Sequence, residues 1–221
     1  MKNTQARVIS TFKMKLVTLF KILLGKIFTY EKMLVFEIQN MPLPERICNF
    51  RMGNESIVTI RLAQSRDVHR LTEKFKKFGE GTAFKRLEKG DLCFIAEKDG
   101  DIVHYTWFAL NEAYVDELER KIQVSHDYAY LYDAYTVPEY RGMGLTFKGV
   151  QIYFDYLHER GIKKTLYVIS PNNLPSLRVA RKVGSRVMGE VTLFGLSSSR
   201  RYRCRGQTPK DYVLLKEMFS I

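Results

Sequence analysis

The chain has 221 residues, of which 45% are hydrophobic, and a formal net charge of +12 at pH 7. This length suits one well-buried domain with an extension and is too short for two large domains. The three cysteines, Cys48, Cys93 and Cys204, are far apart and odd in number. Their spacing argues against a disulfide framework and against a metal site, and it indicates a reducing, cytoplasmic compartment.

The positive charge is concentrated in two segments. Residues 1–33 carry a net charge of +6 and residues 178–205 carry +7, which leaves the remainder close to neutral at −1. A uniformly basic chain is typical of nucleic-acid binding, whereas two local patches indicate two local anionic partners. We therefore expect no nucleic-acid partner.

Residues 12–30 predict an amphipathic helix with a basic face. Lysines interrupt the apolar run, so neither a transmembrane span nor a signal peptide fits. On a helical wheel the apolar residues fall together, namely Leu16, Leu19, Phe20, Leu23, Leu24 and Ile27. Such a stripe docks on its own domain, on a second subunit in a homodimer, or peripherally on the inner face of a membrane. The sequence leaves these alternatives open.

A linker follows this helix, because residues 40–55 contain Pro42, Pro44, Gly53 and Asn54. We therefore expect residues 1–55 to form an N-terminal extension and linker, and residues 56–221 to form the main domain. The domain is predicted to begin with a strand over 56–62.

The next elements alternate between helix and strand. Ser65 is a typical N-cap for a helix that carries Val68, Leu71 and Phe75 and ends at Gly79. Segments 92–97 and 102–110 flank an Asp-Gly pair and predict a β-hairpin. A long, tyrosine-rich strand is expected over 128–137.

Two helices and a final hairpin complete the predicted order. A helix with apolar residues at a 3-4-3 spacing precedes Gly161, and a short strand over 165–169 leads into a second helix that ends at Gly184. Segments 187–194 and 200–205 predict a hairpin whose second strand alternates exposed arginines with Tyr202 and Cys204.

The turn between the long strand and its helix is suited to an anion. Gly142 and Gly144 lack a Cβ, so backbone amides at the positive end of the helix dipole can approach a phosphate closely. The segment is not a P-loop, because no Gly-Lys-Ser/Thr closes it, and Phe147 breaks the dinucleotide-binding pattern. A turn that only reverses the chain is the alternative interpretation.

A second motif lies downstream, where Asn173 and Ser176 open the helix that follows the short strand. Together with Arg141-x-x-Gly144-x-Thr146, this pair of motifs resembles the GNAT superfamily of N-acetyltransferases. That family joins an Arg/Gln-x-x-Gly-x-Gly/Ala pyrophosphate loop to a later Asn-x-x-Ser/Ala helix. Thr146 departs from the family's small last residue. The resemblance spans residues 57–205 and is sharpest over 127–189.

The resemblance implies a mixed α/β fold, in which helices flank a mixed sheet that splays open near Val137. Acetyl-CoA is the implied cofactor, with its pantetheine in the gap and the basic residues of 178–182 near its phosphates. The implied cofactor-binding residues are Thr136, Val137, Arg141, Gly142, Met143, Gly144, Leu145, Thr146, Asn173 and Ser176. Asn173 is also a candidate N-cap of its helix.

Two positions depart from the family. Ala180 replaces the tyrosine that protonates the thiolate in many relatives, and Ser185 replaces the phenylalanine that follows the helix-ending glycine. We therefore sought substitutes on the strands. Asp133 is the leading candidate base, Tyr135 the candidate acid, and His104 a further candidate for proton transfer. Each has a structural alternative. Asp133 could be a carboxylate bonded to the backbone or to an arginine, Tyr135 an aromatic residue of the core or of the substrate wall, and His104 a core histidine whose hydrogen bonds are all made within the fold.

These observations predict an N-acyltransferase that moves an acetyl group from acetyl-CoA to a primary amine by direct attack, without a metal. We expect the acceptor to be a small-molecule amine or an amino sugar. The alternative function is a non-catalytic acyl-CoA-binding or membrane-surface adaptor module, which Ala180 would favour.

Overall fold

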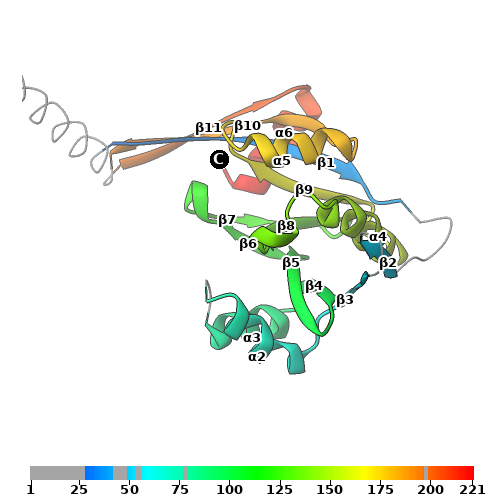
Figure 1. Cartoon of the computed structure of the whole chain (residues 1–221). Helices are drawn as coiled ribbons and strands as arrows, with labels where there is room; N and C mark the ends of the chain where they lie inside the picture. The colour runs from blue at the N-terminus through cyan, green and yellow to red at the C-terminus, as the bar shows by residue number, and fades with distance from the viewer. Residues whose placement is uncertain (1–27, 42–48, 53–55, 77–78, 197–198) are drawn as a thin grey trace, which may run out of the picture.

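A computed structural model describes residues 28–41, 49–52, 56–76, 79–196 and 199–221, and it contains a large, mixed, splayed sheet (Figure 1). Its strands are β1 (Phe28–Gln39), β2 (Asn49–Met52), β3 (Ser56–Leu62), β4 (Leu92–Lys98), β5 (Asp101–Ala109), β8 (Tyr128–Thr136), β9 (Lys164–Ile169), β10 (Arg186–Leu196) and β11 (Ser199–Gly206). Their spatial order is β11-β10-β1-β9-β8-β5-β4-β3-β2. The separate pair β6 (Glu112–Val115) and β7 (Arg120–Gln123) was not predicted.

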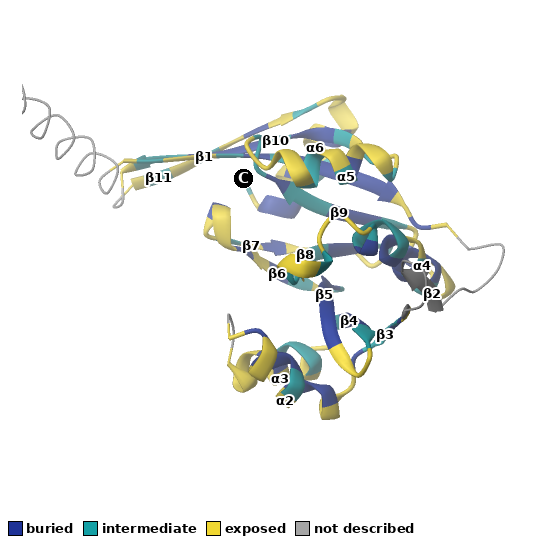
Figure 2. Ribbon diagram, viewed as in Figure 1, coloured by how far each residue is buried: buried dark blue, intermediate teal, exposed yellow. Residues whose placement is uncertain are grey.

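Helices cover both faces of this sheet. They are α2 (Val68–Lys74), α3 (Glu80–Glu88), α4 (Leu145–Glu159), α5 (Leu174–Lys182) and α6 (Pro209–Phe219), with 3₁₀ turns at Ser65–Asp67, Asp116–Leu118 and Pro138–Tyr140. Helices α4 and α5 pack on one face, while α2, α3 and α6 pack on the other. Figure 2 shows many of the strand residues between these layers as buried. The mixed α/β architecture expected from the sequence is confirmed.

Local sequence signals predicted several elements correctly. The turn of the β4–β5 hairpin contains Asp99 and Gly100, both with positive φ, as an Asp-Gly turn requires. Helix α4 ends just before Gly161, whose φ is +77°. In β11, Cys204 is buried whereas Arg201 and Arg203 are exposed.

The first helix of the domain differs from its prediction. Ser65 begins a 3₁₀ turn and not the α-helix itself, and α2 ends at Lys74, before Gly79. A second helix, α3, begins just after that glycine, and α6 follows the last strand; neither was predicted. Helix α3 is short and has only one fully buried residue, Ala83.

The sheet opens between β8 and β9, which are its only parallel neighbours among the described strands. Their pairing runs from Tyr128↔Lys164 to Tyr130↔Leu166 and then stops. Beyond that point β8 continues to pair with β5, and β9 continues to pair with β1. The two strands therefore diverge toward their C-terminal ends, where backbone groups on the facing edges have no partner strand.

The largest departure from expectation is β1, because residues 28–39 were assigned to an extension before the domain. The structure places this strand inside the sheet, antiparallel to β9 on one side and to β10 on the other (Figure 1). Met33 and Val35 are buried in the core that α6 covers. The expected boundary at residues 55 and 56 thus does not separate β1 from the domain.

A buried carboxylate fixes β1 in this position. Glu37 is 3% exposed and accepts hydrogen bonds from Arg186 Nε at 2.9 Å and Lys164 Nζ at 3.2 Å. The Arg186 guanidinium also forms two bonds to Asp211 of α6, at 2.9 and 3.1 Å. One buried charge with two cationic partners thus links β1 to both neighbouring strands, since a buried ion must be paired.

The predicted helix over 12–30 lies outside the described residues up to residue 27, and its last three residues belong to β1. Among the helices that the structure describes, none combines the length and apolar character needed to span a bilayer. A homodimer, a cytoplasmic location and a peripheral membrane contact stay predictions.

Candidate cofactor and acyl-transfer site

The glycine turn lies where the opening meets α4. After the 3₁₀ turn Pro138–Tyr140, Gly142 and Gly144 adopt φ values of +77° and +79°, and Leu145 begins a helix of 15 residues. A Cβ built on either glycine would have no atom within 4 Å, so the space beside the turn is open. The first amides of α4 therefore border free space at the positive end of its dipole, which suits an anion.

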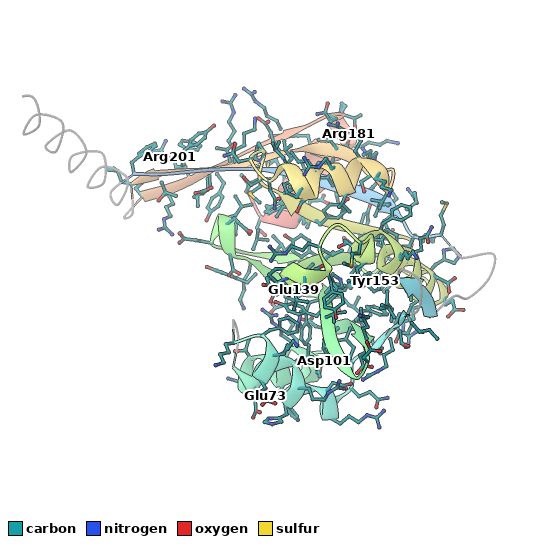
Figure 3. All side chains as sticks on the ribbon, viewed as in Figure 1. Glu73, Asp101, Glu139, Tyr153, Arg181 and Arg201 are labelled. Atoms are coloured by element: carbon teal, nitrogen blue, oxygen red, sulfur yellow. The ribbon has the colours of Figure 1, made fainter. Side chains whose placement is uncertain are left out.

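The remaining residues of the turn surround this space. Met143 is 51% exposed, and Leu145 is buried and anchors the helix start. Arg141 lies back on the strand end, where its Nε donates to the Thr136 carbonyl at 3.0 Å and its guanidinium lies 5.3 Å from the centre of the Tyr135 ring. Thr146 is half-buried in the first turn of α4. Figure 3 labels Glu139 in the same turn.

The end of β8 has fewer free groups than the sequence indicated. The Val137 amide donates to the Val103 carbonyl at 3.1 Å, so this N–H already has a partner. The Thr136 hydroxyl lies 2.8 Å from His104 Nδ1. The Val137 amide is therefore not available to a cofactor.

Helix α5 carries the second motif at its start and contacts α4 near its other end. The Asn173 side chain caps this helix by accepting from the Ser176 amide at 3.2 Å, which confirms Asn173 as an N-cap. Lys182 Nζ lies 4.5 Å from the ring centre of Phe147 on α4, so the two helices meet near their basic residues. Arg178 and Arg181 are exposed on α5, and Figure 3 shows Arg181 on its outer side. These arginines therefore lie on the exposed surface of α5.

Asp133 lies on a different face from the one expected. We expected it to share a face with Leu131, but Leu131 packs toward α4, whereas Asp133 contacts residues beneath α3. Its Oδ2 accepts from Arg86 Nη1 at 2.6 Å and its Oδ1 from the Tyr105 hydroxyl at 3.2 Å. The cause is a β-bulge, because an extra residue reverses the alternation of side chains. These contacts favour the structural alternative for Asp133.

His104 is enclosed in the protein interior, which favours a structural role over a catalytic one. It is 1% exposed, and burial lowers its pKa to about 4, against the opposing influence of the Tyr135 backbone. The imidazole is therefore neutral at neutral pH. Its Nε2 has no hydrogen-bond partner among the described residues. A neutral, enclosed imidazole is poorly placed to exchange protons with an acceptor.

Tyr135 is the most accessible of the three predicted catalytic residues. Its side chain packs edge-on against Phe75 and is stacked at 6.2 Å from Tyr105, yet the residue remains 37% exposed. It follows the bulge directly and faces the same side of the sheet as Asp133. The structure therefore brings the side chains of Asp133 and Tyr135 together over Tyr105, whereas the His104 imidazole lies against the Tyr135 backbone and the Thr136 hydroxyl.

The two residues that depart from the family pattern, Ala180 and Ser185, contact β1 and β9. Ala180 is 2% exposed and packs against Phe36 of β1 and Ile169 of β9. The Tyr167 hydroxyl is hydrogen-bonded to Ser185 Oγ, and the Tyr167 ring is stacked on Phe36 at 5.6 Å. The small side chain of Ala180 therefore packs against Phe36, an aromatic residue of β1.

Two groups beneath β8 do not follow from the sequence pattern. One is Arg86, which lies on α3, a helix that was not predicted. The Tyr132 hydroxyl donates to Asp91 Oδ2 at 2.5 Å, and burial raises the pKa of that carboxyl. Nothing local in the sequence links Arg86 or Asp91 to a strand more than 40 residues later.

With this geometry established, comparison with known proteins identifies the family. The model of the acetyltransferase (GNAT) family matches residues 58–184, which is more than half of the chain. The chain belongs to this family. It is accordingly an acetyltransferase that uses acetyl-CoA. A comparison with curated proteins gives no match.

Solved GNAT structures share the fold. A GCN5-related N-acetyltransferase from Sphaerobacter thermophilus is 14% identical with a TM-score of 0.54, covering 86% of this chain and 57% of that one. A putative GNAT acetyltransferase from Novosphingobium aromaticivorans is 19% identical with a TM-score of 0.52, covering 76% and 66%. A similar enzyme from Kribbella flavida is 13% identical with a TM-score of 0.52, covering 82% and 64%. At such identities the likeness concerns the fold alone.

Two further observations delimit the site. Among the described residues, no cluster of three or more His, Cys, Asp or Glu side chains is arranged to hold a metal ion. A cavity of about 90 Å³ is lined by residues that include Tyr128, Leu166 and Met218. Tyr128 begins β8, whereas the glycine turn follows its other end, so this cavity is not part of the candidate site.

Proposed function

We propose that this GNAT enzyme transfers the acetyl group of acetyl-CoA to a primary amine of a small molecule or an amino sugar, by direct attack of the amine on the thioester. The observation that carries the proposal is the opening between β8 and β9 beside the glycine turn at the start of α4. The turn offers amides and a helix dipole to the pyrophosphate. The unpaired strand edges offer hydrogen bonds to the pantetheine amides.

Attack on the thioester creates an oxyanion that must be stabilised. Backbone amides are suited to this, because they are fixed in place before the reaction begins. Since the Val137 amide is already bonded within the sheet, we assign the oxyanion to an amide at the bulge of β8. The bulge lies on the edge of the opening and interrupts the ladder with β5.

Proton transfers complete the reaction. A lysine-like amine with a pKa of about 10.4 is mostly charged at neutral pH, so it must lose a proton before it attacks. Because Asp133 is ion-paired with Arg86 and His104 is enclosed, we assign neither as the base, and solvent takes this proton. We assign Tyr135 as the acid that protonates the departing thiolate, since it is partly exposed and next to the bulge.

The test is a steady-state assay of free CoA release with acetyl-CoA and a panel of primary amines and amino sugars. Tyr135→Phe should lower kcat by roughly 100-fold, within the range of general acid catalysis, while CoA affinity changes little. Tyr140→Phe is the matched control, because that ring lies in the adjacent turn and contacts Lys98. CoA binding without amine-dependent CoA release would contradict the proposed acceptor class. Full turnover by Tyr135→Phe would exclude this tyrosine as the acid.

A further inference from the structure

The shape of β8 changes at one point along the opening. Across the ladder with β5 the register pairs are Tyr132↔Trp107 and Tyr135↔Tyr105. Between these pairs β5 has one residue, whereas β8 has two, Asp133 and Ala134. Asp133 adopts a φ of +49°, a left-handed conformation that side chains other than glycine rarely occupy. The backbone at the bulge is therefore strained and must be held by its surroundings.

Arg86 supplies a short ionic contact to this residue. Its Nη1 lies 2.6 Å from Asp133 Oδ2, and the two side chains are only 22% and 7% exposed. Tyr105 donates a second hydrogen bond to the same carboxylate, at 3.2 Å. Both oxygens of Asp133 are thus bound from below the sheet. This arrangement fixes the orientation of the residue whose φ is positive.

The guanidinium is itself held by aromatic rings. It lies 5.2 Å from the centre of the Trp107 ring and 5.0 Å from that of Tyr132. These two residues face each other across the ladder, immediately before the bulge. Cation–π contacts of this kind favour the flat, delocalised guanidinium over an ammonium. Arg86 is therefore fixed both by the strand pair and by the carboxylate of the bulge.

We propose that Arg86 is a positioning residue for acyl transfer: it binds Asp133 and thereby holds the β8 bulge in the conformation that presents its amide to the thioester oxygen. This inference rests on the proposed function, because it assigns the oxyanion to the bulge. Arg86 itself does not touch the substrate. Helix α3, on the face of the sheet opposite α4, thus becomes part of the acyl-transfer machinery.

The proposal predicts that a change at Arg86 leaves binding of the cofactor phosphates intact and weakens binding of the thioester oxygen. The phosphates bind at the glycine turn, which Arg86 does not contact, so Arg86→Met should bind CoA within about twofold of the native protein. The thioester oxygen depends on the bulge. If the bulge amide binds that oxygen, the native protein should bind acetyl-CoA more tightly than CoA; Arg86→Met should lose this difference, and its kcat should fall at least tenfold. Arg86→Lys keeps the charge but not the planar fork, and should restore activity only in part.

The decisive measurement is the carbonyl stretching frequency of bound acetyl-CoA labelled with ¹³C in the acetyl group. A hydrogen bond from the bulge amide lowers this frequency relative to free acetyl-CoA. The shift should be present in the native protein and in Lys85→Met, a control on the exposed side of α3. It should be lost or reduced in Arg86→Met and in Asp133→Asn. A purely structural role would lower the melting temperature and leave the frequency unchanged.

The outcomes distinguish this inference from the proposed function. If the native protein acetylates amines while Arg86→Met retains the frequency shift and full kcat, the inference is wrong and the function stands. The same holds if the native complex shows no shift at all. If the native protein releases no CoA with any amine, the proposed function fails. Should Arg86→Met not fold, Asp133→Asn and Arg86→Lys provide the same comparison with smaller changes.

Discussion

The two walls of the opening are built in different ways. The β8 wall is supported by β5, which forms a tight hairpin with β4, and all of these strands come from one continuous stretch of the chain. The β9 wall is supported by β1, which precedes it by more than 120 residues in the sequence. One wall carries the bulge and the candidate acid, and the other carries the helix of the second motif.

This difference indicates that the groups proposed for chemistry lie on the β8 wall, whereas the β9 wall depends on a strand that is distant in the sequence. The β8 wall is built from strands of one stretch of the chain, and it contains the bulge whose Asp133 is bound by Arg86. The β9 wall is complete only when β1 has joined the sheet and its buried carboxylate, Glu37, is bound by Lys164 and Arg186. Substitutions in the β8 wall should therefore alter activity or cofactor binding. Changes in the β9 wall should alter folding.

The largest expected effect concerns the β9 wall. Deleting residues 1–39 removes β1 and leaves Lys164 and Arg186 without the Glu37 carboxylate. Side chains as buried as Met33, Val35 and Phe36 are lost as well, each contributing about 1.5–3 kcal/mol. Because whole domains are stable by only about 5–15 kcal/mol, we expect no cooperative thermal unfolding by circular dichroism.

The matched control is deletion of residues 1–27, which leaves all of β1 in place. This variant should fold and bind CoA within about twofold of the full chain. Cooperative melting of the variant that lacks residues 1–39 would show that the β9 wall stands without β1. Loss of CoA binding by a folded variant that lacks only residues 1–27 would place part of the site in that segment.

The next effect concerns the buried imidazole behind the β8 wall. Since burial lowers the pKa of His104 to about 4 from an ordinary 6.5, the unfolded chain binds a proton between these pH values that the folded protein does not. Stability is therefore highest above pH 6.5 and falls as the pH is lowered toward 4, by at most about 3 kcal/mol from this residue.

Urea unfolding at a series of pH values measures this dependence. His104→Gln should be less stable at neutral pH but should lose less stability on acidification, because glutamine does not titrate. His126→Gln, at an exposed histidine, should keep the native pH dependence. If the stability curves of the native protein and His104→Gln run parallel from pH 7 to pH 4, the imidazole titrates normally and is not enclosed.

The smallest of the three effects concerns the turn at the end of the β8 wall. Gly144→Val forces a β-branched residue into a φ of +79° and places a side chain in the open space beside the first amides of α4. CoA affinity should fall at least tenfold, about 1.4 kcal/mol. Isothermal titration calorimetry with CoA provides the measurement.

Gly161→Val is the control for this strain, because Gly161 has a φ of +77° and open space around it at the other end of the same helix. It should lower stability in a similar way and leave CoA affinity unchanged. Equal losses of affinity in both variants would mean that helix strain, and not the turn, governs binding. Unchanged affinity in Gly144→Val would exclude this turn as the phosphate site.

What the sequence determined by itself is local. The glycine turn, the Asn173 cap and the Asp-Gly hairpin depend on backbone conformations that a few neighbouring residues impose, so their positions could be predicted. The family also followed from such contiguous motifs. The short apolar run Met33–Phe36 was a local signal for a buried strand, but the sequence could not tell which strands it would join.

Only the tertiary structure decided the roles of the side chains around the opening. Asp133 looked like a base because alternation along a straight strand placed it beside Leu131, and one extra residue in β8 turned it toward Arg86 instead. His104 lost its basicity through burial that no local pattern records. A carboxylate or an imidazole takes its chemistry from the charges and the solvent that surround it, and those neighbours come from distant parts of the chain.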